Sequence, residues 1–311
     1  MTASAASAAP PASRWAGPVC AILGVLGFSF KAILIKLAYK HQPLDAVTLL
    51  TLRMLYSVPF FCAMAWLASR REGVVALQRA QWARLVWLGF SGYYLASLLD
   101  FMGLMHITAS LERLVLFLYP TVVVLLSAVL LGTKISRRTG AALLLSYAGI
   151  ALVVAHDLTV TGTTAATLTG SGLVFASAVV YALYLVQAGG LIARLGSLRF
   201  IAWAMLASAA FVFAQFALTR PWSALAVPLS VHGLSLAMAV FATVLPTWLI
   251  AESIRRMGAN ASSLVGSLGP VFTIGFGAMI LGEPLYVVQL AGAALVLAGE
   301  LLVTLKARLA L

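Results

Sequence analysis

Five ionisable side chains lie inside long apolar stretches in the first half of the sequence: Lys31, Arg53, Asp100, Glu112 and Arg113. A charge at the centre of a membrane helix costs about 2.5–3.5 kcal/mol on insertion scales, so residues of this kind indicate a functional site. Three cations and two carboxylates around a cavity would leave one net positive charge. The set favours a substrate that bears a carboxylate or a phosphate, with Asp100 or Glu112 free to carry a proton.

A structural interpretation of the same residues stays open. Lys31 and Arg53 lie about 10–12 Å inside the ends of their predicted helices, at 1.5 Å per residue, whereas the other three lie within about one turn of a helix end. The five groups could pair among themselves, and Lys31 could extend its flexible stem to water.

Two further carboxylates fall in apolar stretches of the second half. Glu252 precedes Arg255 and Arg256 by three and four residues, a spacing that predicts an ion pair on a helix surface. Glu300 is compatible both with a functional role and with a packed hydrogen bond.

Aromatic and proline residues are candidates for the wall and the kinks of a cavity. Tyr93, Tyr119 and Trp248 represent a wider set of aromatic side chains that could line it, although lipid or core packing explains any single one of them. Pro120 and Pro270 each lie near the middle of a predicted helix, where proline removes a backbone donor and frees a carbonyl. Each proline therefore predicts a kink, with a role either in gating or in packing.

The composition points to a polytopic all-α membrane protein. Of the 311 residues, 63% are apolar and 9% are charged, whereas soluble domains are about 45–50% apolar and about 25% charged. Cys20 and Cys62 have no metal-like spacing, and the sequence has no phosphate-binding glycine loop or zinc-protease motif. We therefore expect no enzyme activity, no metal and no cofactor, and a gradient rather than ATP as the energy source.

Helices of about 20 apolar residues are needed to cross a hydrocarbon core of about 30 Å. On that criterion the sequence predicts ten transmembrane helices, at residues 17–38, 45–68, 83–104, 109–131, 139–156, 171–191, 199–218, 229–253, 260–281 and 285–306. The predicted organisation is a disordered lead (1–15), a first five-helix repeat (16–156), a linker loop (157–170) and a second five-helix repeat (171–308).

Basic residues set the predicted orientation. With both termini in the cytoplasm, fourteen Lys and Arg residues fall on the cytoplasmic side, three on the other side and three inside helices. This positive-inside bias fixes the predicted orientation, and the expected location is the plasma (inner) membrane. It also accounts for the net charge of +12 without a nucleic-acid partner.

The two halves match each other at an offset of 150 residues. This offset aligns Pro120 with Pro270, Leu131-Gly132 with Leu281-Gly282, and Ala148-Gly149 with Ala298-Gly299. Because each half holds an odd number of predicted spans, the second copy must insert upside down. Inverted repeats of this kind are common in secondary transporters, which bind substrate near the middle of the membrane.

The repeated stretches resemble a known family. TASLERLVLFLYPTVVVLLSAVLLGTKIS in the first half and RRMGANASSLVGSLGPVFTIGFGAMILGEPLY in the second are similar to the motif that ends each half of EamA-type transporters of the drug/metabolite transporter superfamily. The first copy departs from the motif, since Thr133 stands where the second copy has Glu283. The resemblance implies a ten-helix carrier that exports amino acids or other small metabolites.

These observations together predict a secondary carrier working by alternating access, with a small polar or amphipathic substrate. An amino-acid-like or carboxylate-bearing metabolite and coupling to protons are the expected details. The expected partners are the small-molecule substrate and the lipid bilayer. A passive channel and a non-transport membrane scaffold are the alternatives.

Overall fold

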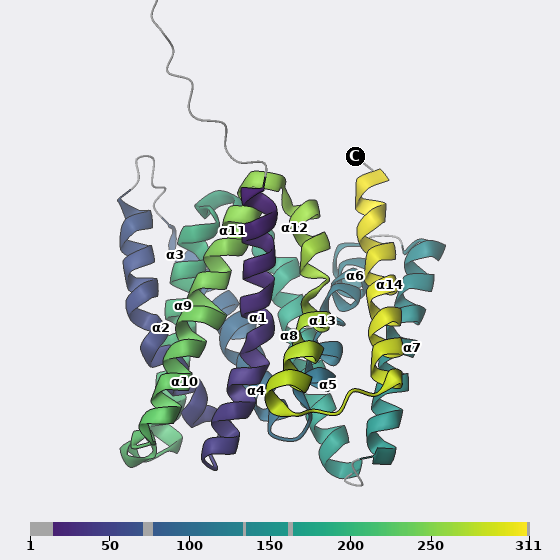
Figure 1. Ribbon diagram of the computed structural model, residues 1–311. Coiled ribbons are helices and arrows are strands. Elements are labelled where there is room, and N and C mark those ends of the chain that lie inside the picture. Colours follow the sequence, from purple (N-terminus) through teal and green to yellow (C-terminus); the bar gives the residue numbers. More distant parts are fainter. Residues whose placement is uncertain (1–14, 71–76, 133–134, 161–163, 310–311) are drawn as a thin grey trace, which may run out of the picture.

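The computed structural model describes residues 15–70, 77–132, 135–160 and 164–309, and over these ranges the chain is helical with no strand. The helices stand side by side as a bundle (Figure 1). The predicted lead of residues 1–15 lies outside the described residues except for Trp15.

Eight helices in the described part of the chain are long and apolar enough to cross a membrane. They are Ala16–His41, Ala46–Ser69, Arg79–Leu104, Ala109–Leu130, Gly140–Leu158, Thr164–Leu195, Ser197–Thr219 and Leu229–Met257. Two shorter apolar helices follow, Gly269–Leu281 and Val287–Gly299. The all-α membrane architecture agrees with the sequence, while the count of ten spans stays a prediction.

The individual elements subdivide several of these spans. The first half contains α1 (Ala16–His41), α2 (Ala46–Ser69), α3 (Arg79–Gly89), the π-helical turn η1 (Phe90–Leu95), α4 (Ala96–Leu104), α5 (Ala109–Leu116), α6 (Tyr119–Leu131) and α7 (Arg137–Val160). The second half contains α8 (Thr164–Leu195), α9 (Ser197–Thr219), the 3₁₀ turn η2 (Trp222–Leu225), α10 (Leu229–Ala239), the π-helical turn η3 (Val240–Val244), α11 (Leu245–Met257), α12 (Ala259–Gly266), α13 (Gly269–Phe276), the π-helical turn η4 (Gly277–Leu281) and α14 (Val287–Leu309).

Two predicted spans are interrupted by a short non-helical turn, at residues 117–118 and 267–268. Residues 109–131 divide into α5 and α6, and residues 260–281 divide into α12, α13 and η4. Each interruption comes directly before a helix in which Pro120 or Pro270 is the second residue. Proline has no backbone N–H and is tolerated in the first turn of a helix but not in its interior, so a new helix starts at each of these positions.

The backbone repeats its irregularities at the offset seen in the sequence. The π-helical turns η1 and η3 begin 150 residues apart, as do α6 and α13 after their interruptions. Gly132 and Gly282 end the matching helices in the left-handed conformation, each with a φ of 68°. The two halves therefore share local structure as well as residues, which supports the predicted internal repeat.

The predicted linker of residues 157–170 is largely helical. Helix α7 runs to Val160 and α8 begins at Thr164, with residues 161–163 outside the described part. A helix keeps its internal hydrogen bonds where it projects beyond the hydrocarbon layer, so an apolar stretch gives only the minimum length of a span.

Helices from opposite halves pack against each other. Helix α1 packs on α10, α11 and α13, α2 packs on α9, and α7 packs on α14. The repeated Gly149 and Gly299 lie in the α7–α14 contact, where an added Cβ would come within 2.7 Å of the carbonyl oxygen of Gly292 or 2.6 Å of that of Ala142. Small residues are needed there because the two backbones approach closely.

Helix α1 begins and α14 ends at the same end of the bundle (Figure 1). We call this end the terminal face and the opposite end the distal face. Helix α2 begins at the distal face, where the side chain of Asp45 accepts hydrogen bonds from the backbone N–H of Val47 and Thr48 at 3.0 and 3.2 Å. Arg220, which ends α9, places its Nε 3.1 Å from Oδ1 of Asp45 and so ties the two halves together.

Replacing Asp45 by alanine is expected to lower the free energy of unfolding by about 1 kcal/mol, the usual effect of losing a helix N-cap. Burial by itself would raise the pKa of Asp45, but the hydrogen bonds from Thr48 and the charge of Arg220 outweigh it and leave the pKa below the ordinary 3.8. The ionised group thus stabilises the fold above pH 3.8 and stops doing so as the pH falls through the lowered pKa. Thermal unfolding of the purified protein should show a difference between wild type and Asp45→Ala that shrinks below about pH 4. A difference that persists unchanged in acid would contradict this assignment.

Candidate functional site

Three of the five charged residues predicted as a site meet between α1, α4 and α5. The Nζ atom of Lys31 lies 2.6 Å from Oδ2 of Asp100 and 3.9 Å from Oε1 of Glu112. Together with Arg53 on α2 and Arg113 on α5, these residues are called the charged cluster below. The predicted pairing among the five is therefore realised for Lys31 and Asp100.

The two carboxylates of the charged cluster are buried and incompletely paired. Asp100 is 2% exposed and Glu112 is 0% exposed. Oδ1 of Asp100 and both side-chain oxygens of Glu112 have no hydrogen-bond partner among the described residues. Ionised carboxylates only accept hydrogen bonds, so two neighbouring carboxylates can share a hydrogen bond only when one of them carries a proton. A pair of carboxylates in this arrangement is able to take up and release a proton.

Arg53 is buried, and part of its guanidinium makes no hydrogen bond within the described residues. Its side chain is 4% exposed, and its guanidinium carbon lies 4.9 Å from the centre of the Phe101 ring. Its Nε and Nη2 atoms have no hydrogen-bond partner in the described part of the chain. The charge of Arg53 acts on Asp100, but the pair is not among the ion pairs within 4.0 Å. A buried guanidinium in this state is able to bind an anionic group in a two-point contact.

Arg113 connects the charged cluster to the second half of the chain. It follows Glu112 on α5, and its guanidinium carbon lies 5.8 Å from the centre of the Phe117 ring. A Cβ added to Gly269, the first residue of α13, would lie 2.6 Å from Nη2 of Arg113. Glycine at 269 thus leaves the space that the guanidinium occupies.

Tyr93 and Tyr119, two of the three predicted wall residues, belong to one aromatic cluster. The hydroxyl groups of Tyr93 and Tyr184 lie 2.9 Å apart, and the ring of Tyr119 meets that of Tyr181 edge to face at 5.3 Å between centres. The rings of Tyr181 and Tyr184 are stacked at 5.6 Å. The third predicted residue, Trp248 on α11, is 49% exposed and lies at the surface of the bundle, where lipid would cover it.

The structure tests the expectation for Glu252 but not the one for Glu300. Glu252 accepts hydrogen bonds from Nε of Arg255 at 2.7 Å and from Nε of Arg256 at 2.6 Å, which confirms the predicted surface ion pair. The side chain of Glu300 lies outside the described residues.

Two polar side chains at the distal face were not among the predicted site residues. Lys36 donates to the carbonyl oxygens of Leu104 and Ile107 at 3.1 and 2.9 Å. Glu283 accepts hydrogen bonds from the backbone N–H groups of Ala109 and Ser110, which begin α5. A sequence signal that could have found Glu283 is its presence in one copy of the repeated motif but not in the other.

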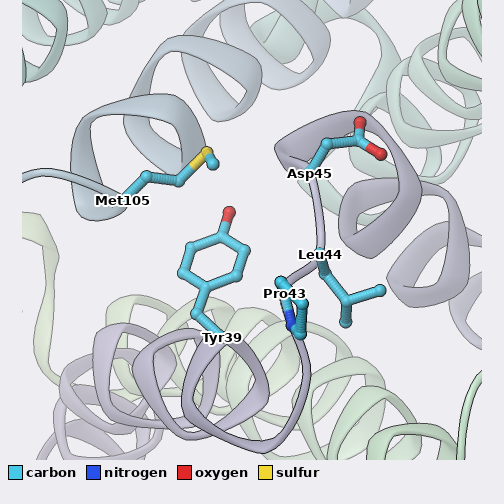
Figure 2. A pocket seen from close by; sticks show the side chains of 5 residues that line it. All are labelled: Tyr39, Pro43, Leu44, Asp45 and Met105. Atoms are coloured by element: carbon cyan, nitrogen blue, oxygen red, sulfur yellow. The ribbon is translucent and has the colours of Figure 1, made fainter.

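Two recesses lie at the distal face. The larger, of about 370 Å³, is lined by Tyr39, Pro43, Leu44, Asp45 and Met105, and the hydroxyl end of Tyr39 points into the space between Met105 and Asp45 (Figure 2). The smaller, of about 160 Å³, has Lys36, Thr108, Leu111 and Asp157 in its lining. The smaller recess lies over the first turn of α5, one residue from Glu112.

Comparison with known proteins gives a consistent picture. The sequence profile of the EamA-like transporter family matches the chain twice, over residues 15–155 and 168–305. The uncharacterized transporter YcbK of Bacillus subtilis (strain 168) is 32% identical over 290 residues, covering 89% of each chain. The uncharacterized transporter YyaM of the same organism is 26% identical over 232 residues, which are 74% of this chain and 76% of YyaM. One crystal structure shares the fold, with a TM-score of 0.63 and 21% identity over 95% of this chain and 99% of the other.

Proposed function

Since this chain belongs to the EamA-like transporter family, we propose that it is a secondary carrier that exports a small polar or amphipathic metabolite by alternating access. The observation that carries the substrate proposal is the charged cluster, which combines a buried guanidinium with free donors and a buried carboxylate without hydrogen bonds. An amino-acid-like or other carboxylate-bearing substrate fits this combination.

In the proposed mechanism Arg53 binds the carboxylate of the substrate. Glu112 then accepts either the ammonium group of the substrate or a proton, and the two exclude each other. An ionised carboxylate that is buried without hydrogen bonds is costly, so Glu112 needs one of these two partners whenever water is excluded. Alternate occupancy of one site by substrate and proton couples export of the substrate to entry of protons. Lys31 pairs with Asp100 at 2.6 Å beside this exchange site.

The helix interruptions at Pro120 and Pro270 are proposed as the hinges of the conformational change in alternating access. They lie at matching places in the two halves, and α13 starts directly beside Arg113. A change in the angle between α12 and α13 would therefore move Gly269 relative to the charged cluster. Alternating access in inverted-repeat carriers moves one helical group against another around a fixed site.

The proposed orientation places the terminal face in the cytoplasm, as the bias of basic residues favours. The charged cluster then lies in the outer half of a cell membrane, and substrate approaches it from the cytoplasm. The predicted division into a lead, two five-helix repeats and a linker is retained as part of this proposal.

Counterflow in proteoliposomes tests the function. Vesicles containing the purified protein are loaded with unlabelled L-amino acids and diluted into a trace of the radiolabelled forms, tested one at a time. A carrier should take up the label transiently above its external concentration, because exchange is faster than net flux. Label that only equilibrates would identify a passive channel, and no entry of any amino acid or of labelled small dicarboxylates would favour the scaffold alternative.

A further inference from the structure

We propose, on the basis of the carrier function above, that Glu283 is a latch that closes the distal face and positions α5, and with it Glu112 and Arg113, in the charged cluster. Nothing in the family match or in the roles proposed so far assigns a function to this carboxylate. The proposal follows from its contacts with α5, from the space that Gly277 leaves for it, and from the asymmetry between the two copies of the repeat.

The Glu283 carboxylate satisfies the amino end of α5. Its Oε1 accepts from the N–H of Ala109 at 2.8 Å, and its Oε2 accepts from the N–H of Ser110 at 3.2 Å and from the Ser110 hydroxyl at 2.8 Å. The next N–H, that of Leu111, is bonded to the side chain of Thr108 at 3.1 Å. The orphan donors of the first turn are thus satisfied, and a negative charge stands at the positive end of the helix dipole.

The helix that Glu283 holds is short and carries part of the charged cluster. Helix α5 has eight residues, and Glu112 and Arg113 lie in its middle. An isolated helix of this length is unstable, so the position of α5 depends on its tertiary contacts, which include α13 and Glu283 from the second half. The second half of the chain therefore helps to set where Glu112 and Arg113 lie.

Local backbone structure brings the carboxylate to α5. The π-helical turn η4 ends at Gly282, and the N–H of Glu283 reaches back to the carbonyl oxygen of Gly277 at 3.1 Å. A Cβ on Gly277 would lie 2.8 Å from Oε2 of Glu283 and 3.1 Å from Oγ of Ser110. Glycine at 277 is what leaves room for the carboxylate to sit against Ser110.

The latch belongs to one copy of the repeat. At the offset of 150 residues, Ser127 and Thr133 stand where the second copy has Gly277 and Glu283. Residues 127–131 are α-helical within α6, whereas residues 277–281 form the π-helical turn. Threonine carries no charge and is shorter than glutamate, so the first copy of the motif has no carboxylate at the matching sequence position.

A second contact crosses between the halves at the same place. Nζ of Lys40, near the distal end of α1, donates to the carbonyl oxygen of Leu281 at 2.9 Å. Movement of η4 away from α1 and α5 must break this bond and the three bonds to Glu283. These bonds therefore stabilise the arrangement in which η4 lies against α1 and α5.

A buried thiol reports on the latch without any transport. In a background carrying Cys20→Ser and Cys62→Ser, Leu111→Cys places a thiol on α5 at a position that is 1% exposed in the wild type. The rate at which a maleimide labels this thiol is measured in the purified, full-length protein. Glu283→Gln is expected to raise this rate by at least about tenfold, as expected for the loss of one charge-assisted hydrogen bond.

A matched pair of glycine variants tests the same contact if Glu283→Gln folds poorly. Gly277→Ala forces a methyl group against the carboxylate and should raise the labelling rate as Glu283→Gln does. Gly275→Ala, on the preceding helix α13, adds a methyl group where no atom lies within 4 Å and should leave the rate unchanged. Glu252→Gln removes a carboxylate from a surface ion pair and serves as the control for charge. Equal rates in Glu283→Gln, Gly277→Ala and Gly275→Ala would overturn the latch.

The positioning role has its own readout. If Glu283 positions Glu112, Glu283→Gln should shift the pH at which counterflow is half-maximal, and Glu252→Gln should not. An unchanged pH profile in Glu283→Gln, in a protein whose wild-type flux depends on pH, would overturn the positioning role. Faster labelling in a protein whose flux has no pH dependence supports the latch and contradicts the proton coupling proposed above, so the two failures are distinguishable.

Discussion

Replacing Arg53 by alanine is expected to lower counterflow by at least about 100-fold, because the substrate carboxylate loses two charge-assisted hydrogen bonds of about 1.5–3 kcal/mol each. Arg53 is 4% exposed, and its buried Nε and Nη2 atoms have no hydrogen-bond partner among the described residues, so the protein itself leaves these donors unused. Arg53→Lys should recover less than about a tenth of the activity, since a point charge does not reproduce a planar two-point contact. The measurement is the initial counterflow rate of the amino acid that wild-type protein exchanges, normalised to the amount of folded protein.

Arg84→Ala is the matched control. Arg84 lies near the start of the span Arg79–Leu104, and its Nη2 donates to the carbonyl oxygen of Gln187 at 2.7 Å in an exposed contact, so we expect a change of less than about twofold. The contrary result is specific. If Arg53→Ala combined with Asp100→Asn restores both protein level and flux, Arg53 is a structural counter-ion of Asp100, and the substrate assignment fails while the fold stands.

Replacing Glu112 by glutamine is expected to abolish uphill transport driven by a proton gradient while leaving counterflow measurable. Glutamine keeps the shape of the side chain but neither takes up nor releases a proton, so substrate and proton no longer compete for the site. The wild-type flux should depend on pH, and the flux of Glu112→Gln should not. Accumulation of label after a pH jump across the vesicle membrane, measured beside counterflow at several pH values, separates the two properties.

Asp100→Asn and Glu252→Gln complete this test. Asp100 is already paired with Lys31 at 2.6 Å, so its replacement should lower protein level before it alters the pH profile. Glu252 lies in a surface ion pair, so Glu252→Gln should change neither the uphill accumulation nor the pH dependence of counterflow. If Asp100→Asn loses the pH dependence of flux while Glu112→Gln keeps it, the group that carries the coupled proton is Asp100 and not Glu112. Retention of the dependence in both would contradict proton coupling through the charged cluster.

Much of the architecture follows from local sequence. Runs of about 20 apolar residues specify membrane helices because unsatisfied backbone groups are costly in lipid. The matching Pro120 and Pro270 specify where two of those helices are interrupted, because proline cannot continue a helix across its own position. The repeated Gly149 and Gly299 lie where the backbones of α7 and α14 approach closely. The double match to the EamA-like family confirms the repeat architecture as well.

The sequence by itself determined which residues are chemically unusual, since charges in apolar stretches are conspicuous wherever they lie. Only the tertiary structure decided how they are used. Lys31 pairs with Asp100 across 69 positions, and Glu283 binds the first turn of α5 across 174. Such pairings depend on which helix ends meet, and hydrophobic patterning does not specify this, because lipid and neighbouring helices are equally acceptable to an apolar face. Trp248 illustrates the same limit, because packing alone placed it on the surface of the bundle.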